Sequence, residues 1–419
     1  MSNNNIKNRW FVVLGAIQIQ LCLGAIYAWS VFTPSLVEAD WTKAQTQAVF
    51  AAGLVFFALV MVLAGRLLPK WGPRKLAFLG GIVLGLGYIL AGLFGGTNFW
   101  SIFIFIGIIG GAGIGLAYVV PIAVGMRWFP DKKGLITGLA VAGFGFGAML
   151  WVKLAGTWGN LILNLGLSLT FTIYGIVFFI TIMIGGIWMV FPAEEWKPEG
   201  WTPPEERKDS KVNKIVDLGS SQMLKTPQYY MILFTFAFGA SAGLMSIGLM
   251  KLFPMQALTN SGLSQSAASG IAGTAMAVFF SLANGFGRIA WGAMSDKLGR
   301  RNSIILMMAM QGVVVIMFQW MAGTPALLYL GATLIGFNFG GNFALFPTIT
   351  ADTFGTKFIG QNYGWVFLAY GIGGIFGPIL GGKLGDMGNF PLTFTICGIL
   401  CLIAAGVISM TKPPKPAYI

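Results

Sequence analysis

The sequence lacks histidine and contains only three cysteines among its 419 residues. Cys22, Cys397 and Cys401 all lie in apolar stretches, so they provide neither a disulfide framework nor the spacing of metal ligands. Zinc and haem are most often held by histidine or cysteine, and the sequence therefore argues against either centre. We predict no metal and no cofactor.

Charge is also scarce, because Asp, Glu, Lys and Arg make up only 9% of the chain, against ~25% of an average soluble domain. Hydrophobic residues make up 56%, and the mean hydropathy is +0.78. This composition excludes a water-soluble fold. Glycine, with 60 residues, is concentrated in the apolar segments, where small residues allow helices to pack closely in a membrane.

The formal net charge of +13 could by itself indicate binding to nucleic acid. The basic residues, however, lie in short loops between apolar segments, without interleaved aromatic residues. If the N-terminus is cytoplasmic, all but five of the 26 Lys and Arg residues fall on the cytoplasmic side. The positive-inside rule then predicts a multi-pass protein of the inner (plasma) membrane with both termini cytoplasmic. Its expected surroundings are a lipid bilayer, and we expect no nucleic-acid partner.

The apolar segments are numerous and long. A helix needs ~20 residues to cross the ~30 Å hydrocarbon layer of a bilayer. Twelve segments meet this length, and they predict an all-α membrane protein with twelve transmembrane helices, at approximately 10–36, 44–68, 76–95, 99–123, 134–158, 167–191, 228–250, 266–293, 303–322, 326–348, 361–382 and 391–410.

A polar segment divides these helices into two sets of six. Residues 192–226 are rich in Pro, Glu, Lys and Arg, a composition that cannot bury a core, and we interpret them as a cytoplasmic linker. The flanking parts, residues 1–191 and 227–419, resemble one another at equivalent loops, with GRLLPKWGPRK after the second span and GAMSDKLGRR after the eighth. We therefore predict two pseudo-symmetric six-helix bundles with a binding site between them.

Arg288 is the most informative single residue. It lies in the eighth predicted span, eight residues before Asp296, hence ~12 Å inside the membrane edge. An ionisable group in a membrane helix costs at least ~2.5–3.5 kcal/mol, which indicates function. The alternative is that its side chain extends to the inner surface. The spacing of Thr274, Ser281, Asn284 and Arg288 favours one polar helix face directed at protein or water.

The sequence offers this arginine no acidic partner, because the Asp and Glu residues lie in loops or at predicted helix ends. A guanidinium is always charged and binds a carboxylate with two parallel hydrogen bonds. We therefore predict that the counter-ion of Arg288 is the substrate, a small organic anion.

Two motifs resemble those of a known family. The loop after the eighth span carries the signature of the major facilitator superfamily, with Gly292, Asp296, Lys297, Gly299, Arg300 and Arg301. The first copy departs from it, since Pro69 stands where the acidic residue belongs. More narrowly, RWFPDKKGLITGLAVAGFGFG over 127–147 resembles the helix 5 signature of oxalate/formate antiporters and monocarboxylate transporters. The resemblance implies a cytoplasmic gate at Asp296, Arg300 and Asp131.

The resemblance also implies a binding site around Arg288 and Asn284. Oxalate carriers of this family have a second cation, a lysine, at the position that aligns with Tyr370. Its loss points to a monoanion, because two cations suit a dianion. The aromatic residues that align with the oxalate cage are Tyr27, Tyr118, Phe144, Phe339, Phe343 and Phe367. Taken singly, each of these could equally be ordinary packing; as a set they favour a cavity, and one that is less polar than in the family.

These observations predict a secondary transporter, expected as a monomer, that moves lactate-, pyruvate- or formate-like monocarboxylates by alternating access. Animal-type monocarboxylate carriers have an Asp where this chain has Asn284, which cannot titrate. Proton symport and anion exchange both remain open. The alternative interpretation is that the protein is an oxalate/formate antiporter. We expect no enzyme, because the sequence shows no nucleophile–base pair and no metal cluster.

Overall fold

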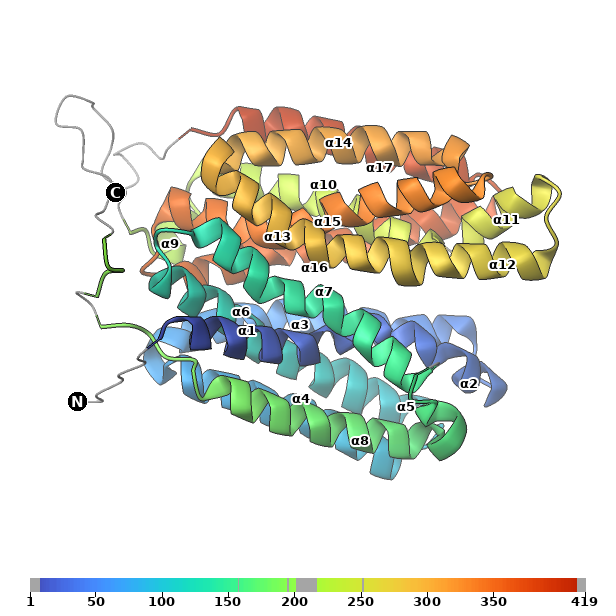
Figure 1. Ribbon diagram of the computed structural model, residues 1–419, viewed down its shortest axis with the longest axis horizontal. Coiled ribbons are helices and arrows are strands. Elements are labelled where there is room, and N and C mark those ends of the chain that lie inside the picture. The colour runs from blue at the N-terminus through green and yellow to red at the C-terminus, as the bar shows by residue number, and fades with distance from the viewer. Residues whose placement is uncertain (1–7, 157, 194–195, 201–216, 251, 413–419) are drawn as a thin grey trace.

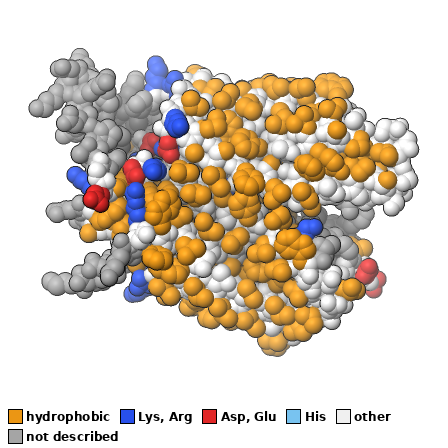
Figure 2. All heavy atoms as spheres, in the orientation of Figure 1, with side chains coloured by type: hydrophobic (Ala, Val, Ile, Leu, Met, Phe, Trp, Pro, Cys, Tyr) orange, Lys and Arg blue, Asp and Glu red, His pale blue; other side chains and the backbone are white. Residues whose placement is uncertain are grey.

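The computed structural model describes residues 8–156, 158–193, 196–200, 217–250 and 252–412. Figure 1 shows two groups of long helices lying side by side, one built from the first part of the chain and one from the second. Charged side chains gather at one end of both groups, and the flanks are covered with apolar side chains (Figure 2). We call that end the charged end; it includes Asp131, Lys133, Asp296, Arg300 and Asp352.

The first group contains the elements up to the predicted linker. They are α1 (Trp10–Leu23), a 3-10 turn η1 (Gly24–Val31), α2 (Thr33–Glu38), α3 (Lys43–Trp71), α4 (Pro73–Leu90), a π-helical turn η2 (Ala91–Gly95), α5 (Phe99–Ile102), a π-helical segment η3 (Phe103–Gly110), α6 (Gly111–Trp128), α7 (Lys133–Ala155) and α8 (Leu161–Gly186).

The second group contains the elements that follow the linker. They are α9 (Ser220–Met223), α10 (Pro227–Leu249), α11 (Leu252–Asn260), α12 (Gln265–Thr274), a π-helical segment η4 (Ala275–Phe280), α13 (Ser281–Leu298), α14 (Arg300–Met321), α15 (Pro325–Phe354), α16 (Ile359–Asp386) and α17 (Phe390–Ser409). The predicted linker, 192–226, includes 194–195 and 201–216, which lie outside the described residues.

Eleven helices within the described ranges are long and apolar enough to cross a membrane. The remaining predicted span, 326–348, corresponds to α15, which is 30 residues long. Its mean hydropathy is lowered by two buried asparagines, Asn338 and Asn342. The predicted all-α membrane fold is confirmed.

The repeated loops that suggested two related halves have the same backbone geometry. Gly72 separates α3 from α4 with φ +79°, and Gly299 separates α13 from α14 with φ +82°. Residues with a side chain rarely adopt these angles. Glycine at the same place in both copies therefore produces the same sharp reversal between consecutive helices.

Close glycine contacts join the two groups near the charged end. On α7, a side-chain carbon at Gly134 would overlap the Gly292 carbonyl of α13, and one at Gly138 would overlap the carbonyl of Arg288. On α3, Gly65 approaches the Gly360 carbonyl of α16 in the same way. Farther from the charged end, α7 crosses away from α13 (Figure 1). The two groups are thus held together at the charged end.

The predicted polar face of residues 274–288 lies only partly inside the protein. The spacing argument treated residues 274–288 as a regular α-helix, but η4 is π-helical and widens the turn between Thr274 and Ser281. Thr274 is exposed and donates to the Gly270 carbonyl at 2.9 Å, whereas Asn284 and Arg288 are buried. The polar face directed into the protein therefore consists of Asn284 and Arg288 and excludes Thr274.

Candidate functional site

Arg288 lies at the contact between the two helix groups. Its side chain is 0% exposed, so it does not extend to the surface. Its Nε donates to Asn284 Oδ1, one turn earlier on α13, at 3.2 Å. Its Nη1 donates at 3.0 Å to the carbonyl oxygen of Val141 on α7. The guanidinium therefore connects the second group to a backbone oxygen of the first.

No carboxylate of the described ranges pairs with Arg288, since the ion pairs found there belong to Arg9, Lys133 and Arg300. Its Nη2 makes no hydrogen bond of normal geometry with a described residue. The guanidinium carbon instead lies 4.1 Å from the ring centre of Phe343 and 5.4 Å from that of Phe144. The hydroxyls of Tyr27 and Tyr118 also interact with the guanidinium. The positive charge is thus stabilised by neutral groups and aromatic faces alone.

The predicted aromatic residues come together around this charge. Phe144 packs edge-on against Tyr27 and Tyr118, with ring centres 5.0 and 5.6 Å apart. On the other side, Phe367 and Phe343 flank Tyr370 at 5.1 and 5.5 Å. The two sides meet where Tyr118 and Phe367 approach to 5.3 Å.

Phe339 takes an outer position in this cluster. Its ring lies 5.4 Å from Phe343 and 6.2 Å from Phe280, so it supports a ring that faces the guanidinium. All the predicted binding residues are therefore neighbours, although only some of them contact Arg288.

Two members of the cluster were missed by the sequence analysis. Phe57 on α3 lies 4.9 Å from both Tyr118 and Phe367 and touches both helix groups. It lies in the uniformly apolar run AGLVFFALV, where periodicity cannot separate an inward-facing ring from a lipid-facing one. Val141 contributes only its carbonyl oxygen, which no side-chain pattern can indicate.

A pair of hydroxyls closes the cluster between the groups. Tyr27, on the 3-10 turn η1, and Tyr370, on α16, are hydrogen-bonded through their hydroxyl oxygens. Tyr370 is 0% exposed. The tyrosine that aligns with the second cation of the oxalate carriers is therefore neutral and engaged with the opposite helix group.

The predicted gating residues lie at the charged end. Asp296 accepts the backbone N–H groups of Gly134 and Leu135, both at 2.9 Å, at the start of α7. Arg300 donates to Asp296 at 2.6 Å and to Asp352 at 3.0 Å. A carboxylate at a helix N-terminus is stabilised by the free N–H groups and by the helix dipole. Asp296 therefore joins α13 to the first helix group, and Arg300 holds Asp296 from within the second group.

Asp131 also lies at the charged end, but its ion pair is within the first helix group. Its carboxylate receives two hydrogen bonds from Arg9, at 2.8 and 3.2 Å. Arg9 also lies over the Phe129 ring, 4.2 Å from its centre. Both residues belong to the first group, so this pair fastens the start of α1 to the loop between α6 and α7.

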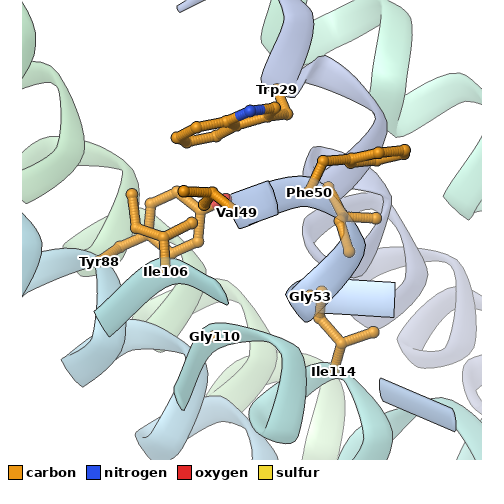
Figure 3. A pocket seen from close by; sticks show the side chains of 9 residues that line it. Trp29, Val49, Phe50, Gly53, Tyr88, Ile106, Gly110 and Ile114 are labelled. Atoms are coloured by element: carbon orange, nitrogen blue, oxygen red, sulfur yellow. The ribbon is translucent and has the colours of Figure 1, made fainter. Parts of the chain in front are cut away.

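A separate small cavity lies wholly within the first group (Figure 3). Trp29, Val49, Tyr88 and Ile106 line it, and no charged side chain does. The indole N–H of Trp29 donates to the Thr46 carbonyl at 2.8 Å. This cavity offers nothing to hold an anion, unlike the Arg288 site. Within the described part of the chain, no group of three or more His, Cys, Asp or Glu residues could hold a metal ion.

Several known proteins are similar to this chain in sequence. An uncharacterized MFS-type transporter of Escherichia coli, YhjX, is 30% identical, with 89% of this chain and 87% of YhjX covered. The oxalate:formate antiporter of Oxalobacter formigenes is 27% identical (98% and 93% covered), and apicoplast pyruvate carrier 1 of Toxoplasma gondii is 23% identical (86% and 81% covered).

The fold is shared with a solved structure of the proton:xylose symporter XylE bound to 6-bromo-6-deoxy-D-glucose. The TM-score is 0.70 at 13% identity, with 96% of this chain and 95% of XylE covered. The sequence model of the Major Facilitator Superfamily matches residues 15–279 and 257–418, which together span nearly the whole chain. The chain is a multi-pass membrane protein and belongs to the Major Facilitator Superfamily of transporters.

Proposed function

We propose that this protein is a secondary transporter of small monocarboxylates, with lactate, pyruvate and formate as the substrate class. A single observation carries the proposal: the fully buried Arg288 has no carboxylate partner among the described residues. A substrate carboxylate that binds at Nη1 and Nη2 supplies the missing anion. It would replace the Val141 carbonyl as the acceptor for Nη1.

The site is better suited to one negative charge than to two. Tyr370 stands where a second cation would neutralise a second carboxylate, and its hydroxyl is engaged with Tyr27. The rings of Phe144 and Phe343 on the guanidinium offer an apolar surface to a short carbon tail. A pyruvate carrier and an oxalate:formate antiporter among the relatives are consistent with this class.

Alternating access follows from where the groups are joined. Contacts at Gly134, Gly138 and Asp296 close the charged end, so this conformation has its site closed from that side. We assign the charged end to the cytoplasm, with both termini there, in the plasma membrane. Transport then requires that substrate binding weaken the contacts at the charged end while the opposite ends of the two bundles, residues 1–191 and 227–419, close.

Two modes of coupling fit the site: exchange of one anion for another, and symport of the substrate with a proton. Asn284 cannot take up a proton, and it accepts a hydrogen bond from Arg288. Anion exchange needs no titrating residue. Proton symport would move the proton with the substrate carboxylate or through another acceptor. Counterflow of labelled monocarboxylate with and without an imposed pH gradient separates the two modes.

The decisive experiment is uptake of labelled lactate, pyruvate and formate into proteoliposomes by the wild type and by Arg288→Gln. We expect the substitution to abolish uptake, because glutamine keeps a polar group but loses the charge. Lys297→Gln is the matched control, since it removes a positive charge from an exposed position of the same helix, α13. Normal uptake by Arg288→Gln would refute the proposal.

Oxalate/formate antiport is the second candidate, favoured by the relative of that name, with which 98% of this chain aligns. Competition by unlabelled oxalate against labelled lactate distinguishes the two. A monocarboxylate site with one cation predicts weak competition. Strong competition by oxalate would favour the antiporter.

A further inference from the structure

A groove between α1, α7 and α8 lies apart from both the Arg288 site and the small cavity of Figure 3. Two residues of α1, three of α7 and five of α8 line it. Its volume is about 420 Å³, within the ~300–1,000 Å³ that is typical of sites for small molecules. The groove is therefore large enough for a ligand and not only for a water molecule.

The groove has a buried floor and one open side. Cys22, Trp151 and Tyr174 form the floor, and each is at most 5% exposed. Val177 on the rim is 37% exposed, and the other six lining residues are half-buried. The three helices that form the groove are long and apolar enough to cross a membrane. The open side consequently faces lipid hydrocarbon.

The polar atoms of the floor are already engaged. The indole N–H of Trp151 donates to the Leu21 carbonyl at 2.7 Å, and the Tyr174 hydroxyl donates to the Trp151 carbonyl at 2.5 Å. The side chains of Cys22 and Thr181 are hydrogen-bonded to each other. The groove thus presents an apolar surface, which suits a hydrocarbon chain and offers little to a carboxylate or a sugar.

One basic residue lies beside the groove, at the end of α7 that is remote from the charged end. Lys153 is two residues before the last residue of α7, and the lining residues Leu150 and Leu154 flank it. Leu150 is three residues away, so the two side chains are neighbours on the helix surface. No carboxylate of the described ranges forms an ion pair with Lys153.

The next aromatic residue marks the level of this lysine in the membrane. Trp158 follows the end of α7, is 62% exposed, and donates its backbone N–H to the Lys153 carbonyl at 2.8 Å. Exposed tryptophan is typical of the headgroup level of a bilayer. The Lys153 ammonium therefore lies where lipid phosphates lie, next to a groove that suits a lipid chain.

We propose that this groove binds one acyl chain of a phospholipid whose phosphate pairs with Lys153. The opposite charges attract at the membrane surface. Inside the membrane, the chain gains close packing against the aromatic floor, the interaction that drives association where the surroundings are already apolar. The chain lies behind α7, the helix that also carries Val141 and Phe144 of the Arg288 site. The inference does not depend on which substrate is transported.

The groove is tested by filling it. Protein purified in dodecyl maltoside is titrated with dioleoyl phosphatidylglycerol, and bound lipid is counted by native mass spectrometry. Val177→Trp places an indole in the space that the chain needs, so we expect the affinity for the lipid to fall about tenfold. Ile173→Trp fills the same groove from one turn away and should act alike.

The matched control is Ile176→Trp. Ile176 is the neighbour of Val177 on α8, is 44% exposed and does not line the groove, so its variant should bind lipid as the wild type does. Melting temperatures in detergent show that the variants are folded. Wild-type binding by both groove variants, or an equal loss in Ile176→Trp, would mean that the lipid is held elsewhere on the flank and would overturn the proposal.

The phosphate contact is tested separately. Lys153→Gln should lower the affinity for phosphatidylglycerol about fivefold at low salt, and the difference should shrink at high salt. Lys383→Gln is the control, because it removes a positive charge from an exposed position in the last turn of α16. If Lys153→Gln binds the lipid as tightly as the wild type, the assignment of the phosphate to Lys153 is wrong.

Discussion

The two repeated loops at the charged end share a backbone geometry but differ in their electrostatics. Both change direction at a glycine with positive φ, Gly72 or Gly299, and both place a helix against the opposite group through close glycine contacts. In the second copy, Asp296 accepts two N–H groups at the start of α7. In the first copy the corresponding residue is Pro69, which is exposed and has no side-chain acceptor to offer α16.

The region opposite the first copy receives a carboxylate from elsewhere. Asp217, in the described end of the predicted linker, accepts the N–H of Lys357 at 3.0 Å just before α16. Next to it, Asn362 donates to the Leu218 carbonyl at 2.9 Å. These contacts fasten the linker to the second group and do not join the two groups. Two contacts of basic side chains do join the groups at the first copy: Arg127 donates to the Lys357 carbonyl at 2.9 Å, and Arg66 lies over the Trp365 ring, 5.3 Å from its centre. The comparison teaches that steric fit closes both pairs of helices, while only the second copy places a carboxylate of its loop at the N-terminus of the facing helix.

The largest effect is expected from filling the close glycine contacts, which both copies have. Gly134→Val and Gly65→Val each place side-chain atoms against a facing backbone carbonyl. Overpacking costs about 1–3 kcal/mol, so each variant should shift the equilibrium away from the closed charged end by roughly five- to a hundredfold. Spin labels at the exposed positions Lys132 and Leu298 report the opening as a longer distance. If only one of the two variants lengthened the distance, close steric fit would control closure at one pair of helices and not at both.

Removing the charge of Asp296, which only the second copy has, should produce a smaller effect. Asp296→Asn keeps the size of the side chain but removes the charge that faces the α7 N-terminus and Arg300. Charged hydrogen bonds contribute about 1.5–3 kcal/mol, and part of each remains with asparagine, so we expect roughly a tenfold shift toward the open charged end. The same spin-label distance measures it. An unchanged distance distribution would mean that this carboxylate contributes nothing to closure.

The smallest effect is expected in the first copy. Pro69→Ala removes an exposed ring that makes no electrostatic contact between the groups, so the distribution of label distances and the transport rate should both stay within about twofold of the wild type. Ala suits a helix interior, where Pro69 lies. A shift as large as that of Asp296→Asn would remove the distinction between the two copies.

Much of the architecture could be predicted from the order of residues. The helices are long apolar runs, and each run must satisfy its own backbone hydrogen bonds in a membrane, which leaves little choice but a helix. The one span whose hydropathy is low, α15, was still predicted because its length was sufficient. Arg288 was identified by the same logic, since a lone charge in an apolar helix stands out against its neighbours.

Some details could not be predicted because they depend on local irregularity. The π-helical η4 changes the angle between Thr274 and Asn284, and a spacing rule assumes a constant angle per residue. Phe57 looks like any other phenylalanine in an apolar run until α3 is packed against α16. Asp131 lies in a motif loop, yet its partner, Arg9, is distant in the chain.

The sequence by itself determined that this chain spans a membrane as two related sets of helices, and that one arginine lies within the membrane without an evident acidic partner. Composition and spacing suffice for both, because they are properties of single segments. Only the tertiary structure decided which groups surround that arginine. The Val141 carbonyl and the rings of Phe144 and Phe343 reach it from different helices, and their distances depend on how the two groups pack against each other.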